Sequence, residues 1–105
     1  MTSASEIKAF TDALVARFSP NKVVLFGSYA DGSAGPDSDV DLLVIMDHEG
    51  RASRQALNIR RSLPKNFPLD LIVRTPEEVQ RRMTLRDPFM TEALSRGQTL
   101  YERNQ

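Results

Sequence analysis

The chain has 105 residues, 40% of them hydrophobic and 27% charged, with a formal net charge of zero and no cysteine. This length predicts one domain over residues 1–105 and leaves no room for a separate substrate-binding domain, while the missing cysteines exclude disulfides and thiolate metal sites. Because no apolar run approaches about 18 residues and no basic segment precedes an apolar one at the N-terminus, we expect no membrane span, no secretory signal and a cytoplasmic location.

The first half of the chain predicts two helices and two buried strands. Ser3 and Glu6 form a capping-box pattern ahead of an apolar stripe with helical spacing. Residues 22–26 are short, apolar and β-branched, which is typical of a strand covered on both faces. A short helix begins at Ser28, and a second buried strand covers residues 40–46.

The second half continues the alternation of helices and strands. The pattern predicts a helix over 52–63, a strand over 67–73, a helix from Thr75, a helix from Asp87 to Gly97 and an edge strand over 99–101. Four phenylalanines are predicted to pack in the core: Phe10, Phe18, Phe67 and Phe89. The order of elements favours an α/β fold, with a small mixed β-sheet flanked by helices.

Two carboxylates open the second strand. In a strand, alternate residues share a face, so Asp39 and Asp41 point the same way. Two residues of strand span roughly 6.6 Å, and ions in two-metal sites lie about 3.5 to 4 Å apart. Carboxylates at this spacing can therefore converge on one ion or on a pair of ions.

A third carboxylate, Asp70, interrupts the next apolar strand. A lone carboxylate there would lose much of its hydration unless it were paired or ligated. If this strand lies beside the second one, Asp70 completes a cluster with Asp39 and Asp41, whose mutual repulsion a cation would relieve. Oxygen ligands without His or Cys select hard ions such as Mg²⁺ or Mn²⁺. The alternative is that these aspartates only cap turns at strand ends.

Gly27 and Ser28 follow the first buried strand directly. A glycine at this point allows another group to approach the backbone closely, and a serine that begins a helix offers a hydroxyl and free N–H groups to phosphate oxygens. By itself such a pair is more typical of a plain turn. Here it is followed, after ten residues, by Asp39 and Asp41 at the start of a strand.

This combination resembles the polymerase-beta-like nucleotidyltransferase superfamily, and within it the minimal nucleotidyltransferase branch. The similar segments are LFGSYADG, PDSDVDLLV, LDLIV and GQTLYER. The resemblance implies the fold of that superfamily. It also implies that Gly27 and Ser28 hold the triphosphate of ATP, that Asp39 and Asp41 bind two Mg²⁺ ions, and that Asp70 helps to ligate metal and activates the acceptor hydroxyl. The chain departs from the family at Asp31, where members often have Arg.

The same resemblance implies a biological role. Stand-alone minimal members are similar to antitoxins paired with a HEPN-domain ribonuclease toxin, and the implied reaction is transfer of AMP from ATP to a tyrosine of that toxin. Two alternatives stay open: an antitoxin that acts by binding alone, and transfer to a small molecule or nucleic acid. Direct nucleic-acid binding is not expected, because aromatic residues interleaved with basic ones are sparse.

Charge is distributed unevenly along the chain. Residues 27–50 contain no Lys or Arg, and their acids are Asp31, Asp37, Asp39, Asp41, Asp47 and Glu49. Residues 51–86 are rich in arginine instead. The asymmetry suggests a cation site in the first region and a surface for an acidic partner in the second, although solvated helix faces explain the basic region equally well.

Overall fold

The computed structural model describes residues 1–104, and its elements follow the predicted order. The helices are α1 (Ala4–Phe18), α2 (Ser28–Asp31), α3 (Ala52–Ser62), α4 (Pro76–Thr84) and α5 (Pro88–Arg96). The strands are β1 (Lys22–Phe26), β2 (Val40–Ile45), β3 (Leu69–Arg74) and β4 (Gln98–Glu102). The sequence predicts the third strand over 67–73, but the strand starts after Pro68, which has no N–H for a ladder.

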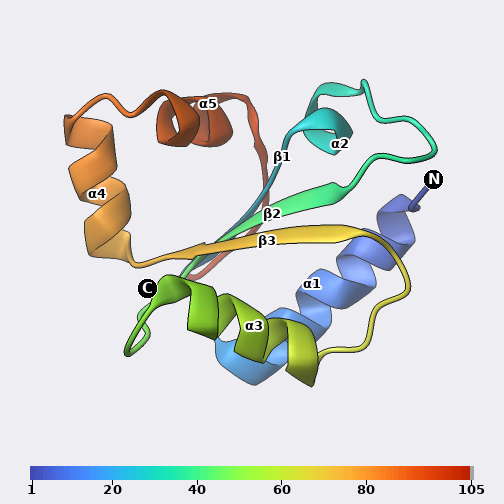
Figure 1. Cartoon of the computed structure of the whole chain (residues 1–105), viewed down its shortest axis with the longest axis horizontal. Helices are drawn as coiled ribbons and strands as arrows, with labels where there is room; N and C mark the ends of the chain where they lie inside the picture. Colours follow the sequence, from blue (N-terminus) through green and yellow to red (C-terminus); the bar gives the residue numbers. More distant parts are fainter. Residues whose placement is uncertain (105) are drawn as a thin grey trace.

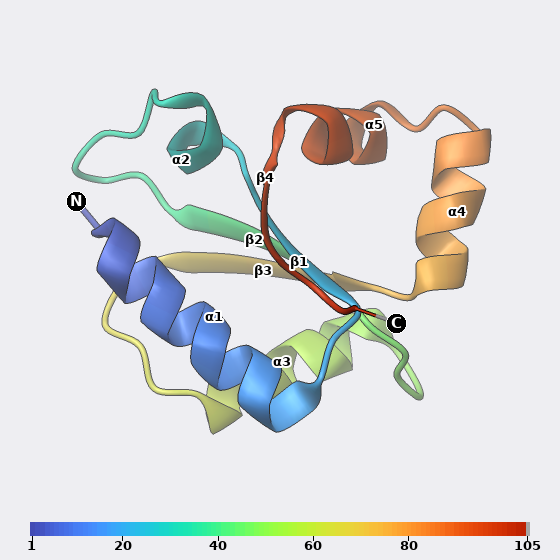
Figure 2. The same ribbon diagram turned by 180° about the vertical axis from the view of Figure 1, so that it is seen from behind.

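The four strands form one mixed sheet in the order β3-β2-β1-β4. β2 and β3 are parallel, whereas β1 is antiparallel to both of its neighbours, β2 and β4. Helices α1 and α3 cover one face of the sheet, and α4 and α5 lie on the other side (Figures 1 and 2). The predicted small mixed sheet flanked by helices is therefore confirmed. Within residues 1–104, no helix has the length and apolar character needed to cross a membrane.

Side chains of β2 alternate between two apolar cores. Leu42 and Val44 pack in the core beneath α1 and α3, while Leu43 and Ile45 pack in the smaller core beneath α5. By the same alternation, Asp41 belongs to the α5 face of the sheet, at the end of the smaller core. The strand is thus buried on both faces along most of its length. Its one partly exposed residue, Asp41, lies at the end of the core beneath α5.

Helix starts follow the predicted capping chemistry. The Ser3 hydroxyl accepts a hydrogen bond from the Glu6 N–H (3.1 Å), and the Glu6 carboxylate accepts one from the Ser3 N–H (2.9 Å), so the capping box is complete. Thr75 caps α4 in the same manner by accepting from the Glu78 N–H (3.1 Å). These side chains satisfy N–H groups that have no partner within their helices.

A side chain of α3 ties that helix to the start of β3. The Arg60 guanidinium donates from Nη1 to the Leu69 carbonyl oxygen at 2.6 Å. The neighbouring Arg61 is exposed, and within residues 1–104 it takes part in no ion pair or side-chain hydrogen bond. Two adjacent arginines therefore have different surroundings, one joined to the sheet and one in solvent.

Arg60→Ala is expected to lower the free energy of unfolding by about 1 to 2 kcal/mol, because a partly buried hydrogen bond to a charged donor is lost. Arg61→Ala is the matched control and should change stability by less than about 0.5 kcal/mol. Urea unfolding of both variants makes the comparison. Equal stabilities would show that the Arg60 contact contributes nothing.

Candidate functional site

Strand register brings two of the predicted site residues together. Asp41 of β2 is the direct neighbour of Asp70 on the parallel strand β3, and Phe26 of β1 is the neighbour of Asp41 on its other side. Phe26, Asp41 and Asp70 therefore form one row across three strands, the carboxylate row, at the end of the core beneath α5. The sequence places Asp70 beside Asp41 only if the two strands are adjacent, and they are.

The pKa of Asp41, in the middle of this row, departs from its ordinary value. Partial burial raises the pKa of Asp41, and the charges of Asp70 and Asp39 raise that pKa further. Asp39 and Asp70 are both exposed. The expectation that Asp70 would suffer the loss of hydration is therefore wrong: β3 is an edge strand whose start remains open to water, and the penalty falls on Asp41 instead.

The three carboxylates do not form a ready-made metal cage. Among residues 1–104, no group of three His, Cys, Asp or Glu side chains is arranged to hold an ion, so the predicted cluster of Asp39, Asp41 and Asp70 is not preformed. The donors nevertheless suit a hard cation, because all three are carboxylates and the charges of Asp70 and Asp39 lie close enough to Asp41 to raise its pKa. None of the ion pairs within residues 1–104 supplies a counter-charge to them.

Gly27 is required where the end of β1 meets Asp41. Its backbone has φ 74° and ψ −151°, a conformation essentially confined to glycine. A Cβ atom built on Gly27 would overlap with Oδ2 of Asp41. Gly32, with φ 84°, also has a positive φ, but no atom lies within 4 Å of its added Cβ. Of these two glycines, Gly27 is thus the one on which the position of a site carboxylate depends.

Ser28 begins α2 directly after Gly27. The Gly27 carbonyl accepts from the N–H groups of Ala30 (3.0 Å) and Asp31 (3.1 Å), so backbone bonds alone close this turn. Within residues 1–104 the half-buried Ser28 hydroxyl makes no hydrogen bond. The hydroxyl is consequently available to a ligand.

Asp31 is engaged within its own turn. Its Oδ1 accepts hydrogen bonds from the Ser33 N–H (2.9 Å) and the Ser33 hydroxyl (2.6 Å). These bonds, with a smaller contribution from the charge of Arg96, hold the pKa of Asp31 below its usual value. The residue that departs from the family pattern is therefore an ionised carboxylate with a structural role in the turn after α2.

A cavity of about 220 Å³ separates α2 from α5 beside this turn. Its lining residues are Phe26, Gly27, Ala30, Asp31, Phe89, Glu92, Ala93, Arg96 and Gly97. Phe89 was expected in the core, but it is 38% exposed and meets Phe26 edge to face, with ring centroids 5.3 Å apart. The cavity joins the carboxylate row through Phe26 and Gly27.

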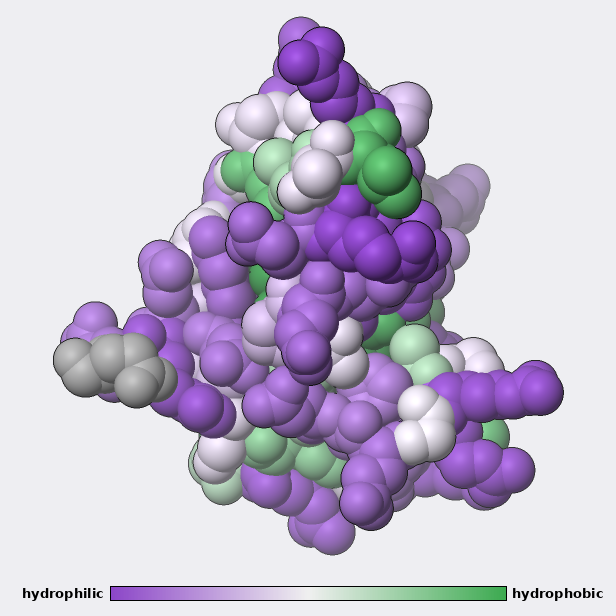
Figure 3. All heavy atoms as spheres, turned by 90° about the vertical axis from the view of Figure 1, so that its left-hand side faces the viewer, coloured by the Kyte–Doolittle hydropathy of each residue, from purple (hydrophilic) through white to green (hydrophobic). Residues whose placement is uncertain are grey.

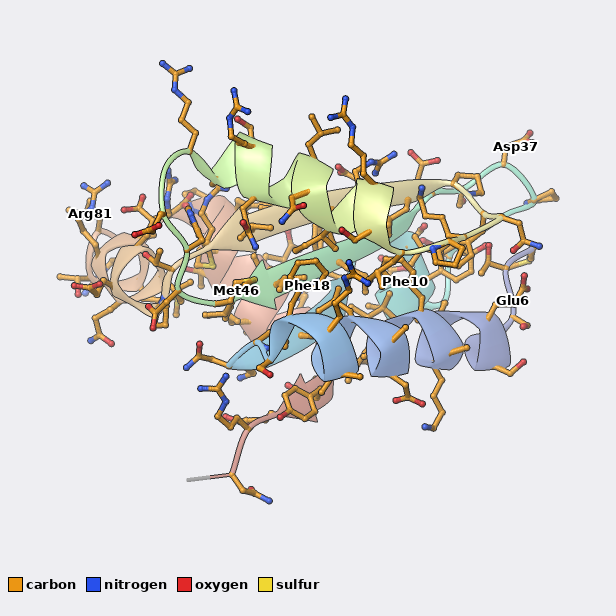
Figure 4. All side chains as sticks on the ribbon, turned by 90° about the horizontal axis from the view of Figure 1, so that it is seen from below. Glu6, Phe10, Phe18, Asp37, Met46 and Arg81 are labelled. Atoms are coloured by element: carbon orange, nitrogen blue, oxygen red, sulfur yellow. The ribbon has the colours of Figure 1, made fainter. Side chains whose placement is uncertain are left out.

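The basic stretch over residues 51–86 does not form one surface. Its first part lies on α3, which covers the sheet face opposite the carboxylate row, and its later part lies on α4, on the α5 side (Figure 1). Figure 4 places Arg81 of α4 at the end of the molecule opposite Asp37, whose loop leads into β2. Figure 3 faces α4 and shows a mainly hydrophilic surface there. A protein docked on α3 would therefore not reach the carboxylates by the same contact.

Comparison with known families decides the identity of this fold. The family model described as a nucleotidyltransferase domain matches residues 7–99. The chain belongs to the nucleotidyltransferase domain family. The predicted family and fold class are thereby confirmed, and the region matched contains Gly27, Asp41 and Asp70.

Similar proteins add detail to the family assignment. A candidate protein adenylyltransferase of Methanocaldococcus jannaschii, MJ0604, is 39% identical over 49 residues, which cover 45% of this chain. The match spans 49%, or about half, of that relative's length. A solved candidate nucleotidyltransferase from Sulfolobus solfataricus has a TM-score of 0.65 at 20% identity, covering 94% of this chain and 79% of that one.

Two further solved structures are toxin–antitoxin complexes. One contains AMP-PNP; its TM-score is 0.60 at 19% identity, covering 93% of this nucleotidyltransferase and 75% of that chain. The other is the MntA–HpeT complex with two Asp-to-Glu substitutions; its TM-score is 0.57 at 18% identity, with coverage of 93% and 75%. At these identities the likeness establishes a shared fold.

Sequence reasoning missed the α5 wall of the site. Phe89, Glu92 and Arg96 are spaced by three and four residues, a pattern that puts them on one side of a helix. That spacing is visible in the sequence, but nothing local says that this side of α5 faces α2. The packing of α5 on β1 decides it.

Proposed function

We propose that residues 1–105 act as a single minimal nucleotidyltransferase domain that transfers AMP from ATP to a hydroxyl group of a partner protein. The observation that carries the proposal is the close approach of the Asp41 carboxylate, beside Asp70, to Gly27, which also lines a cavity. Family membership supports nucleotidyl transfer as the class of reaction. The resemblance to a protein named as an adenylyltransferase supports ATP as the donor.

Asp39, Asp41 and Asp70 are the residues that would hold the divalent metal, which we propose to be Mg²⁺, with two ions as the expected number and Mn²⁺ as a substitute. Bound metal would stabilise negative charge on the phosphate and on the attacking and leaving oxygens. Asp41, the least hydrated of the three, gains most from a cation, because burial and then the charges of Asp70 and Asp39 raise its pKa, and a bound cation would offset both effects.

Asp70 has the exposure that contact with an acceptor requires. Its carboxylate projects from the edge strand β3 and is open to solvent, next to Asp41. We assign it the role of accepting a hydrogen bond from the acceptor hydroxyl, which orients the oxygen and helps to remove its proton. The oxygen then attacks the α-phosphorus of ATP, the bond to the bridging oxygen breaks, and pyrophosphate leaves.

Gly27 and Ser28 are assigned to the triphosphate. Without a side chain, Gly27 lets phosphate oxygens approach the backbone beside Asp41, and the unpaired Ser28 hydroxyl can donate to one of them. The same absence of a side chain leaves room for the Asp41 carboxylate. Triphosphate and carboxylates are thus held on either side of one glycine.

The acceptor is proposed to be a tyrosine of a HEPN-type ribonuclease toxin, with this chain as the antitoxin. The similarity of the fold to two toxin–antitoxin complexes supports such a partner. An exposed Asp70 also suits a large acceptor, because the hydroxyl of a folded protein can reach an open sheet edge but not an enclosed pocket.

Intact-mass measurement of the partner tests this proposal. The product of the neighbouring gene is produced alone and together with this chain, and each sample is weighed by mass spectrometry. The expected result is a gain of one or more AMP groups on the partner only after co-production, at a tyrosine located by peptide analysis. An unmodified partner that is nevertheless bound and neutralised would establish the binding-only alternative and refute the enzyme.

A further inference from the structure

The cavity between α2 and α5 contains a basic residue that no part of the proposed chemistry uses. Among its lining residues, Arg96 is the single cation; Glu92 lies beside it on α5, and Asp31 lines the cavity from α2, as does the neighbouring Gly27. Phosphate groups seated beside Gly27 would lie close to several carboxylates. A cation at this cavity is what such an anionic ligand needs.

Packing fixes the helix that carries Arg96. Met90 and Ala93 of α5 are buried against β1 and β2, and Gly97 follows with no room for a side chain. A Cβ on Gly97 would lie 2.7 Å from a Val24 methyl group and 2.8 Å from the Leu25 carbonyl oxygen. The last turn of α5 is therefore held against β1, so Arg96 is presented to the cavity from a rigid base.

Within residues 1–104, Arg96 takes part in no ion pair. The Asp31 carboxylate, which lines the same cavity, already accepts two hydrogen bonds from Ser33. Asp31 thus influences Arg96 through its field without fixing it in a salt bridge. The guanidinium keeps its donors for a ligand, and its planar fork matches phosphate oxygens.

We propose that Arg96 is a nucleotide-binding residue that contacts the phosphates of the nucleoside triphosphate in the cavity between α2 and α5. The inference rests on the proposed function for its ligand and deepens it by naming the cation of the site. Asp31 acts in the opposite sense: its charge faces the same phosphates and weakens their binding. The balance of these two side chains adjusts the affinity for ATP that Gly27, Ser28 and the bound metal would provide.

Binding of ATP in the presence of Mg²⁺, measured by calorimetry on the full chain, tests the inference without requiring transfer. Arg96→Ala should raise the Kd about 10- to 100-fold, the effect of losing hydrogen bonds to a charged partner. Arg96→Lys should restore part of the affinity. Asp31→Asn should lower the Kd, because it keeps the Oδ1 acceptor for Ser33 and removes the charge. Arg61→Ala, on the far face of the sheet, should leave it unchanged.

The outcomes separate this inference from the proposed function. An unchanged Kd in Arg96→Ala overturns the role of Arg96, even if AMP transfer by the wild-type chain is confirmed. A raised Kd in a chain that transfers nothing supports Arg96 and refutes the enzyme. A raised Kd accompanied by a lowered melting temperature, without rescue by Arg96→Lys, would mean that Arg96 only supports the fold. A wild-type chain that binds no ATP refutes both.

Discussion

Asp41→Asn is expected to abolish AMP transfer while leaving the metal-free protein at least as stable as the wild type. Burial and the neighbouring carboxylates raise the pKa of Asp41, so its ionised form is less favourable in the folded chain than in the unfolded one. The protonated Asp41 therefore favours the folded state at low pH, and this contribution to the free energy of unfolding is lost as the pH rises through the folded-state pKa. Asparagine is uncharged, so its burial costs less hydration free energy than burial of a carboxylate. It is also not repelled by the charges of Asp70 and Asp39.

The loss of activity should be at least about 100-fold, because changing even the supporting partners of metal ligands costs about 10- to 100-fold. Transfer is measured with labelled ATP, and stability by thermal unfolding at neutral pH without divalent cations. Asp47→Asn is the control: that carboxylate is exposed beyond the other end of β2 and should change neither quantity. An inactive Asp41→Asn variant that is also clearly destabilised would mean that Asp41 is structural.

Gly27→Ala is expected to lower both stability and transfer. The backbone conformation at this position costs about 1 to 3 kcal/mol for a residue with a side chain, and the added methyl group would displace the Asp41 carboxylate. We therefore expect a loss of at least about 1 kcal/mol in the free energy of unfolding, together with loss of most of the activity. Urea unfolding and the AMP-transfer assay measure the two effects.

Gly32→Ala separates backbone strain from the overlap with Asp41. Gly32 has a positive φ of 84°, but no atom lies within 4 Å of its added Cβ. Its substitution should cost about 1 to 2 kcal/mol from the left-handed backbone and leave transfer nearly intact. If Gly32→Ala and Gly27→Ala lose activity equally, the close approach of Gly27 to Asp41 has no special role.

Local chemistry made most of the fold predictable. The capping box at Ser3, the cap at Thr75 and the buried run over β1 each depend on neighbouring residues in the sequence, and all of them occur as expected. The common face of Asp39 and Asp41 stays a prediction, because β2 begins at Val40 and Asp39 lies just before the strand. The position of Asp70 next to Asp41 follows once β2 and β3 are taken as adjacent strands.

Features that depend on long-range packing were not predictable in this way. The exposure of Asp70 follows from the edge position of β3, and the exposure of Phe89 follows from its place in the lining of a cavity. Whether α3 or α5 contributes residues to the site likewise depends on which face of the sheet each helix covers (Figure 1). A helical stripe such as Phe89, Glu92 and Arg96 reveals a shared side of a helix but not its partner.

Transfer from ATP labelled at either the α- or the γ-phosphate tests the central claim most directly. The chain is incubated with Mg²⁺, the purified partner and one labelled nucleotide at a time, and the label on the partner is counted. The proposed reaction predicts that the α-label appears on the partner and that the γ-label leaves as pyrophosphate. Appearance of the γ-label on the partner, or of neither label on a partner that is still inhibited, would contradict nucleotidyl transfer at the row formed by Asp41 and Asp70.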